Sequence, residues 1–140
     1  MKKGIIVILA LLSCTSNAAT LSLSDDIELI AVNGVNVGLM KEVVLPSGQH
    51  FIEVRYAEIF ETLSDSSDWV KSSSMYLRLN LENDISYKLS TMNYDTSEEA
   101  GHFEENPKLF ISSENEIKKE VKVMNMSKIL NEFQSSLLAE

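Results

Sequence analysis

The side chains best suited to metal binding or acid–base chemistry lie close together near residue 100. Glu98 and Glu99 precede His102 by four and three positions, and on a helix these spacings place side chains on one face. Two carboxylates and one imidazole can bind a metal ion weakly, but they lack the third strong ligand of a typical protein site. The simpler interpretation is that His102 makes a helix hydrogen bond that directs Phe103 into the core. We therefore keep the histidine and its two glutamates as weak functional candidates and expect no metal.

The rest of the sequence offers little support for catalysis. His50 follows a turn at the start of a strand, where a histidine is usually a surface or cross-strand partner. Asp25, Asp26, Asp65 and Asp68 do not have the spacing of an EF-hand calcium loop. The glycines are scattered, and neither a phosphate-binding loop nor a Gly-x-Ser-x-Gly or His-Glu-x-x-His motif occurs. The sequence thus predicts a protein that is not an enzyme and uses no cofactor.

The N-terminus has the pattern of an export signal. Two lysines precede a nine-residue apolar run, Gly4–Leu12, and a short segment of mostly small and polar residues follows. The run is about half as long as a membrane-spanning helix requires, so the mature protein is not expected to span a membrane. We interpret residues 1–19 as a signal peptide and residues 20–140 as a single β-rich domain in the periplasm.

The sequence leaves two processing routes open. Ordinary cleavage fits after Ala18 or Ala19, because both place a small residue at the cleavage position. Leu11-Leu12-Ser13-Cys14 instead resembles a bacterial lipobox, in which the cysteine is acylated and anchors the protein in the outer membrane. On either route Cys14, the single cysteine, leaves no free thiol in the folded domain. A disulfide framework and a cysteine nucleophile are therefore excluded.

The charge of the chain narrows the classes of partner. The first 19 residues hold two of the 12 basic residues and none of the 21 acidic ones, so the remainder carries 10 basic against 21 acidic residues, a net charge of −11. Nucleic acid and anionic membrane surfaces bind proteins that have a positively charged surface, so both are disfavoured as partners of this acidic domain. Cationic partners are favoured, although solubility alone also explains an acidic surface.

Alternating apolar residues predict mostly β-strands. Residues 27–32 form a β-branched run followed by Asn33-Gly34, a pair that favours a type I′ hairpin turn. Residues 42–45 are strand-like and lead into a Pro-Ser-Gly turn. A long strand from His50 to about Ile59 then places three apolar residues on one face, namely Ile52, Val54 and Tyr56.

The middle of the chain predicts a second hairpin, a loop and a helix. Residues 76–81 and 85–90 alternate on either side of a polar turn and predict a meander hairpin with one solvent-facing side. Residues 62–74 are typical of a long surface loop held by Trp69, which we also keep as a weak functional candidate. A capping-box pattern at Thr96 predicts a short helix to about Phe103.

The C-terminal part adds two short strands, over residues 108–112 and 120–124, and a helix that begins at a Ser127 cap. The helix carries an apolar stripe of Ile129, Leu130, Phe133 and Leu137. The overall prediction is a mainly β protein: a small antiparallel β-sandwich with one short internal helix and a C-terminal amphipathic helix.

Five segments, in this order along the chain, resemble a family of secreted bacterial proteins. They are residues 20–24, 27–34, 45–54, 100–103 and 107–109. The family carries a domain-of-unknown-function label and includes the curli assembly inhibitor type. The segment with the Asn-Gly turn and Leu-Pro-Ser-Gly-Gln-His is also similar to PEGA-type β-modules. The resemblance implies a periplasmic, mostly β protein with no known catalytic residues, and it ends at about Met124.

Two hypotheses for function follow. The first is a non-enzymatic periplasmic binding or accessory protein that uses sheet edges to modulate the assembly of extracellular fibre subunits. The second is an envelope-attached accessory lipoprotein acylated at Cys14. In both we expect a protein partner, no nucleic acid and no membrane span, with a membrane anchor only if Cys14 is lipidated.

Overall fold

The structure, a computed structural model, describes residues 17–61 and 66–139. These residues are mainly β, with one short internal helix and one C-terminal helix, as the sequence predicts. The strands are Ala18–Leu23 (β1), Ile27–Val32 (β2), Val35–Asn36 (β3), Glu42–Pro46 (β4), Gly48–Glu61 (β5), Ser67–Lys71 (β6), Met75–Leu81 (β7), Ser86–Thr91 (β8), Leu109–Ser113 (β9) and Lys119–Val121 (β10). The helices are Ser97–Gly101 (α1), followed by the 3₁₀ turn His102–Glu104 (η1), and Met126–Leu138 (α2).

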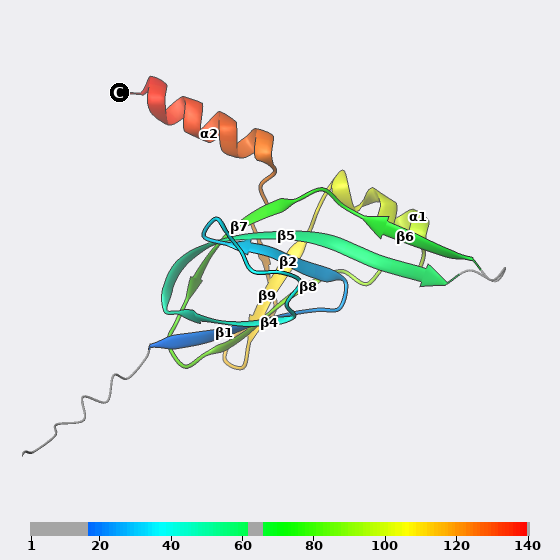
Figure 1. The fold of residues 1–140 in the computed structure, drawn as a ribbon, viewed down its shortest axis with the longest axis horizontal. Coiled ribbons are helices and arrows are strands. Elements are labelled where there is room, and N and C mark those ends of the chain that lie inside the picture. Colours follow the sequence, from blue (N-terminus) through cyan, green and yellow to red (C-terminus); the bar gives the residue numbers. More distant parts are fainter. Residues whose placement is uncertain (1–16, 62–65, 140) are drawn as a thin grey trace, which may run out of the picture.

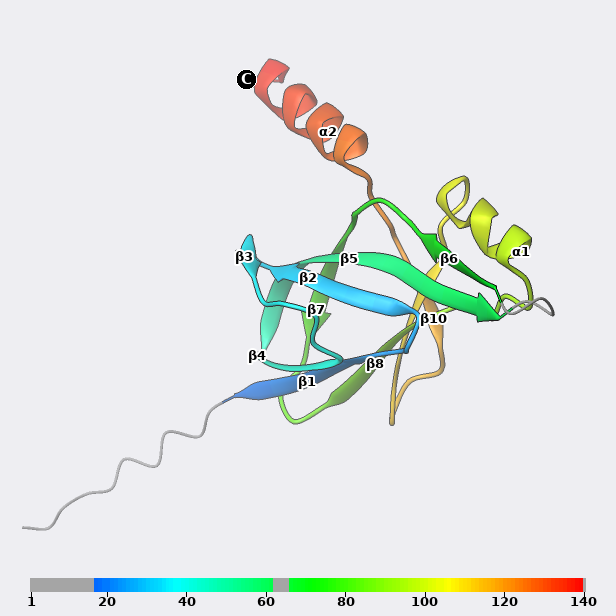
Figure 2. The same cartoon turned by 45° about the vertical axis from the view of Figure 1, so that its right-hand side comes forward.

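The strands form two layers, and α2 extends away from them (Figure 1, Figure 2). One sheet has the order β10-β9-β8-β1-β4, and the other has the order β3-β2-β5-β6 with β7 also paired to β5. All described strand pairs are antiparallel except β1–β8, which is parallel. The mainly β, sandwich-like prediction is thus confirmed, with one parallel pair that residue alternation does not reveal.

Strand β5 is the centre of its sheet, because it is long enough to pair with three other strands. It pairs with β2 on one side, while on the other side its first half pairs with β7 and its second half with β6. Ile52, Val54 and Tyr56 have no exposed surface, and the residues between them are only half-buried. The predicted inward face of this strand is confirmed.

The core lies between the two sheets and continues under α1. Its fully buried side chains come from both layers, with Leu21 and Leu89 in one sheet and Leu29 and Leu77 in the other. At one end the ring of Tyr56 stacks on that of Phe103, with 4.9 Å between the ring centroids. Phe103 is only 2% exposed, so the predicted inward direction of this side chain is confirmed.

The turn between β2 and β3 has the predicted geometry. Asn33 and Gly34 both have positive φ, at 52° and 80°, as a type I′ turn requires. Val32 pairs with Val35 across the turn, so the two strands form a short hairpin.

Strands β7 and β8 do not form the predicted meander hairpin. Strand β7 pairs with β5, whereas β8 lies between β1 and β9 in the other sheet. The turn around Asp84, which has φ of 60°, therefore carries the chain from one layer to the other. The predicted buried faces are nevertheless correct, because residue alternation shows which face of a strand points toward the core, whichever strand lies beside it. The buried residues of these faces are Leu77, Leu79, Leu81, Tyr87 and Leu89.

Residues 67–71 are a strand and not part of the predicted 62–74 loop. Strand β6 pairs with the last residues of β5, and Trp69 lies opposite Ile59. Trp69 is 59% exposed, so it does not anchor this segment by burial. The segment is held by backbone hydrogen bonds to β5, which a polar Ser/Asp-rich sequence can make at the end of a sheet.

Both helices are capped by side chains. Thr96 Oγ1 accepts the N–H of Glu99 at 3.2 Å, as the capping box predicts, while the Glu99 carboxylate accepts the N–H of Asp95 at 3.2 Å. The cap of α2 is Asn125 and not the predicted Ser127, because Asn125 Oδ1 accepts a first-turn N–H at 2.9 Å. Asparagine and serine cap helices about equally well, so residue type alone does not distinguish the two positions.

The β7 face assignment predicts opposite outcomes for two neighbouring substitutions. We expect Leu79→Asp to reduce the free energy of unfolding by about 4 kcal/mol or to prevent folding, because an unpaired carboxylate would enter the core. Asn80→Asp, on the exposed face of the same strand, should change it by less than about 0.5 kcal/mol. Equal shifts in the urea midpoint would contradict the assignment.

The β2–β3 turn can be tested with two glycines that differ in backbone conformation only. An added Cβ meets no atom within 4 Å at either Gly34 or Gly101, but Gly34 has φ of 80° and Gly101 has φ of −60°. Gly34→Ala should destabilise the protein by about 1 kcal/mol, whereas Gly101→Ala should be neutral or stabilising. Thermal melting measures both, and a neutral Gly34→Ala would refute the I′ geometry.

Candidate functional site

The predicted cluster around His102 is not assembled. His102 Nδ1 lies 3.4 Å from Glu105 Oε2, and both side chains are largely exposed. Glu99 bonds to the backbone before the helix and not to the histidine. Within residues 17–61 and 66–139, no group of three or more His, Cys, Asp or Glu side chains could hold a metal ion. Glu98 and Glu99 therefore lie in the first turn of α1, and His102 lies at its C-terminal cap.

Four further candidate residues concern the N-terminal processing and the acidic loop. Cys14 and Asp65 lie outside the described residues. Ala18 and Ala19, the expected cleavage residues, both belong to β1. Ala18 O accepts the N–H of Asp84 at 2.9 Å, and Ala19 is 1% exposed. Both alanines are thus part of the folded domain.

Trp69 is on the surface of the β5–β6 hairpin. Lys71 Nζ lies 3.8 Å from the centroid of its ring, and Ile59 beside it in the neighbouring strand is 55% exposed. The hairpin thus presents an apolar pair to solvent, and the predicted interest in Trp69 rests on exposure and not on anchoring.

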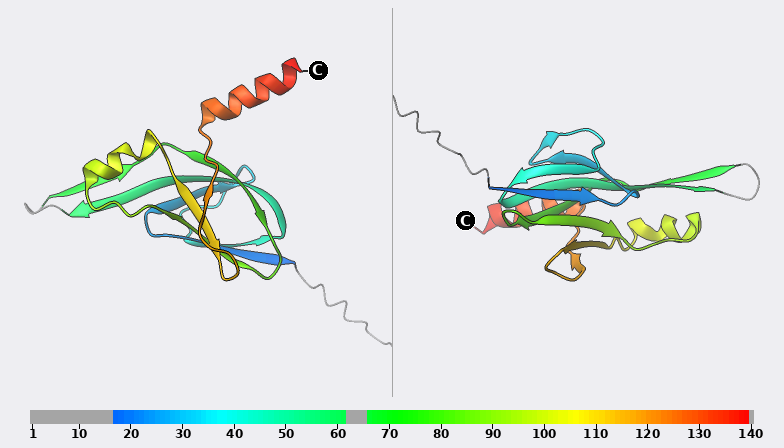
Figure 3. Two further views of the ribbon diagram at one scale, coloured as in Figure 1. Left: turned by 180° about the vertical axis from the view of Figure 1, so that it is seen from behind. Right: turned by 90° about the horizontal axis from the view of Figure 1, so that it is seen from below.

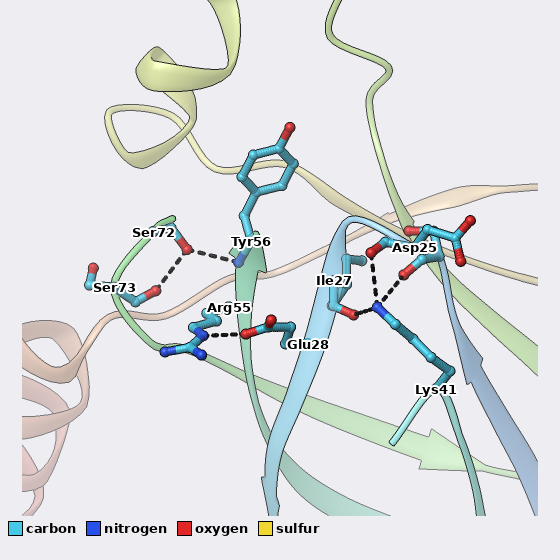
Figure 4. A network of polar contacts seen from close by, with 9 residues as sticks. Asp25, Ile27, Glu28, Lys41, Arg55, Tyr56, Ser72 and Ser73 are labelled. Carbon is cyan, nitrogen blue, oxygen red and sulfur yellow. Dashed lines mark hydrogen bonds and ion pairs between the residues drawn. The ribbon is translucent and has the colours of Figure 1, made fainter. Parts of the chain in front are cut away.

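Polar contacts fasten the turn between β1 and β2 to its surroundings (Figure 4). Lys41 Nζ donates to the carbonyl oxygens of Asp25 at 2.9 Å and Ile27 at 2.7 Å. Arg55 Nε donates to Glu28 Oε2 at 2.5 Å across the β2–β5 pair. The lysine thus donates hydrogen bonds to backbone carbonyl oxygens of the turn that would otherwise bond to water.

A polar cavity of about 500 Å³ lies beside the same turn. Asp26, in its wall, accepts hydrogen bonds from Ser24 Oγ at 2.5 Å and from Thr91 Oγ1. Glu58, also in the wall, accepts one from the Tyr56 hydroxyl. Because these carboxylates bond to their own neighbours, we interpret the cavity as the polar end of the core and assign it no catalytic role.

This environment alters the acidity of two phenols, the buried Tyr56 and the partly buried Tyr94. Burial, followed by the hydrogen bond and charge of Glu58, raises the pKa of Tyr56 well above its ordinary value of 10.0. Burial, followed by the charge of Asp26, raises the pKa of Tyr94. The folded state therefore holds these phenols in their neutral form.

Strand β4, next to this turn, is held at both ends. At its start Lys41 O accepts the N–H of Leu23 at 2.9 Å, while Lys41 Nζ bonds to the β1–β2 turn. At its end Pro46 O accepts from His50 Nε2 at 2.6 Å, and His50 Nδ1 meets Asn33 Nδ2 at 3.0 Å. Asn33 Oδ1 accepts the N–H of Phe51 at 2.9 Å, which fixes the amide and leaves its NH₂ for the imidazole. His50 is thus a cross-strand partner, as the sequence predicts.

One side of β4 has no strand beside it in the described part of the chain. The β1–β4 register is continuous, and bonds at Lys41 O and Ser47 N–H bracket it. Because residues of an antiparallel pair alternate in the direction of their backbone groups, Val43 and Leu45 bond to β1, whereas Glu42 and Val44 point outward. Val44 is 64% exposed. Strand β4 therefore offers outward donors and acceptors on a fixed backbone.

The other sheet edges are shorter or covered. Strand β3 has two residues, and β10 has three with Lys119 at its start. Helix α1 lies beside β6, and Ser97 Oγ donates to Asp68 Oδ2 at 3.1 Å. The outer side of β7 is partly occupied by Met124, which exchanges two backbone hydrogen bonds with Tyr76 at 2.8 and 3.0 Å. Of β3, β4 and β10, the described strands that end a sheet with no helix beside them, β4 is the longest.

The fold and this edge define a small two-layer β protein that presents an open strand. The chain belongs to the bacterial family described as "Uncharacterized protein conserved in bacteria (DUF2057)", whose sequence model matches residues 20–137. The match includes most of α2, so the expectation that the resemblance ends at about Met124 is wrong. No curated protein and no solved structure matches the chain. In the described residues, no helix is both long and apolar enough to cross a membrane.

The edge position of β4 could not be predicted directly, because residues 42–45 have the pattern of any short strand. The one usable signal was Pro46 at the strand end. Proline cannot donate to a ladder and is largely confined to edge strands and strand ends. Whether β4 lies at the edge of its sheet depends on its pairing partners, and these depend on residues far along the chain.

The raised pKa values of Tyr56 and Tyr94 predict a loss of stability at alkaline pH. An unfolded tyrosine ionises near pH 10, whereas these two phenols remain neutral to higher pH in the folded state. Their contribution to the free energy of unfolding is fully present below about pH 10 and is lost as the pH rises above it. Tyr56→Phe should flatten this decline in the free energy of unfolding between about pH 9 and about pH 11. At about pH 8 the tyrosine is neutral in both the folded and the unfolded state, so the difference between variant and wild type there reports the lost hydrogen bond. If the variant lost stability with pH as steeply as wild type, the account would be contradicted.

Proposed function

We propose that the protein is a non-enzymatic periplasmic binding module that adds an extended segment of another protein alongside β4. The observation that carries this proposal is the outward-facing side of β4, which is fastened at both ends and has no neighbour among the described strands. Strand addition supplies affinity through backbone hydrogen bonds and so tolerates varied partner sequences. A strand held in place loses little conformational entropy when a partner binds.

Exposed apolar side chains near this edge support a protein partner. Four apolar side chains in the ten-residue stretch 35–44 are 48% to 67% exposed, namely Val35, Leu39, Met40 and Val44. Soluble proteins more often expose apolar side chains singly, and a concentration of them marks contact surfaces. A partner strand beside β4 would place alternate side chains next to Val44.

The proposed partner is a subunit of an extracellular fibre, of the curli type. The resemblance to curli assembly inhibitors supports this choice, as does the need of a growing cross-β fibre to add strands at its free edge. The similarity of residues 27–54 to PEGA-type modules supports a role at the cell surface. A protein with 21 acidic and 12 basic residues would meet a cationic subunit faster than an acidic one.

The periplasmic location rests on the N-terminal sequence. Its paired lysines, nine-residue apolar run and small residues are the parts of an export signal. These residues lie outside the described part of the chain, so the location stands as part of the proposal.

One substitution tests the edge directly. Val44→Pro removes an outward N–H and should abolish the ability of substoichiometric protein to lengthen the lag before a purified curli-type subunit forms fibres. Val44→Thr is the matched control, since it changes the side chain but keeps the N–H and should preserve most of the delay. Both variants should keep the wild-type circular dichroism spectrum.

Two outcomes would contradict the proposal. An unchanged lag with equimolar wild-type protein would remove the fibre subunit as partner. A folded Val44→Pro variant that delays fibres as well as wild type would remove β4 as the site. Added salt should weaken the delay if the subunit is cationic, because screening reduces the attraction.

A second candidate, an envelope-attached accessory lipoprotein acylated at Cys14, is favoured by a different observation. Cleavage after Ala18 would remove the first residue of β1, and cleavage after Ala19 would also remove the buried Ala19. Processing at Cys14 would leave β1 whole and add a short tether before it. The intact mass of the exported protein distinguishes the routes, and a mass without lipid that begins at Ala19 or Thr20 would exclude the lipoprotein.

A further inference from the structure

Helix α2 carries an apolar stripe that is largely exposed in the described part of the chain. The helix has no buried residue, and it extends away from both sheets (Figure 3). Met126, Leu130, Phe133 and Leu137 are each 50% to 59% exposed. A helix of 13 residues that exposes this much apolar surface lacks the packing that usually stabilises helices of its length.

The stripe has the spacing of a coiled-coil seam. Its members follow one another at intervals of four, three and four residues, which is the alternation of d and a positions in a heptad. The positions that flank the seam hold Ser127, Ile129, Gln134 and Ser136, all of which are uncharged. The seam thus has neutral borders, so two identical helices can meet along it without like-charge repulsion.

The charged side of α2 faces the body of the protein. Glu132 Oε2 lies 3.2 Å from Arg78 Nη2, and Glu132 Oε1 lies 3.3 Å from Lys122 Nζ. At 3.6 residues per turn, Glu132 is about 130° around the helix from the centre of the seam. These ion pairs, together with the Met124–Tyr76 bridge before the helix, direct the seam away from the sheets.

We propose that α2 is a self-association element that pairs with α2 of a second copy of this chain in antiparallel orientation. One register buries the whole seam, because Met126 then faces Leu137 of the other copy and Leu130 faces Phe133. Each contact joins a d position to an a position, as antiparallel coiled coils require, and the arrangement has the two-fold symmetry of a closed dimer.

A membrane surface fits this helix less well than a second copy does. Helices that lie on membranes have a broad apolar face and several Lys or Arg residues on the polar face. Helix α2 has one lysine and one glutamate, and the whole chain has a net charge of −9. Anionic lipid would therefore repel the protein.

Sedimentation equilibrium of the purified exported protein tests the proposal. We expect a reversible monomer–dimer equilibrium, weak because the contact is small, in which the average mass rises toward two chains between about 10 µM and about 1 mM. Leu130→Glu should weaken association by at least about tenfold, because it places a charge in the seam. Asn131→Glu adds the same charge off the seam and should leave the dimer intact.

The remaining outcomes each overturn the proposal. A wild-type protein that stays monomeric throughout this range has no self-association through α2. Equal weakening by Leu130→Glu and Asn131→Glu would place the contact elsewhere. Co-sedimentation of the monomer with phosphatidylglycerol vesicles, lost in Leu130→Glu, would identify lipid as the occupant. The dimer does not depend on the fibre-subunit role, so either can fail alone.

Discussion

The packing of β5 against three partner strands is the constraint on which the rest of the fold depends. Its inward residues Ile52, Val54 and Tyr56 are completely buried, and its backbone joins β2, β6 and β7 into one sheet. A strand of this kind cannot move without breaking ladders on both sides. Only Ser47 separates it from β4, which belongs to the other sheet.

That short connection places β4 at an edge. The chain must leave one layer and enter the other within one residue, and Gly48 has φ of 121°, a conformation that favours glycine. A strand at such a corner has β1 on one side and open space on the other. His50 reinforces the corner through Pro46 and Asn33. The open side of β4 is therefore a consequence of how the two layers are joined.

The sequence predicted most of the local structure but not the pairing of strands. The Asn33-Gly34 turn, the inward faces of β5 and β7 and the Thr96 cap all follow from short-range preferences, and all are confirmed. The β7–β8 hairpin was wrong and the parallel β1–β8 pair was missed, because alternation specifies a face and not a neighbour. Trp69 was misplaced for a related reason, since its strand is held by backbone bonds that leave little trace in side-chain composition.

For the candidate sites too, local roles could be predicted from the sequence, whereas contacts with the rest of the chain could not. His50 took the predicted role of cross-strand partner, which its position after a turn suggests. The Glu98–His102 spacing placed three side chains on one short helix but could not show that Glu99 bonds to the backbone before it. Leu130, Phe133 and Leu137 of the α2 stripe were predicted from the sequence, whereas their exposure was not, because burial depends on what the rest of the chain covers. Ile129, the fourth predicted member, is half-buried, and Met126 takes its place in the exposed stripe.

The most direct test of the central claim is amide hydrogen exchange at β4, with and without the fibre subunit. In the free protein the outward N–H of Val44 should exchange almost as fast as in an unfolded chain, while the N–H of Val43, bonded to β1, exchanges slowly. Saturating subunit should slow Val44 by at least about tenfold and leave Val43 unchanged. A Val44 amide that is already protected in the free protein, or that exchanges equally fast in the complex, would contradict the account.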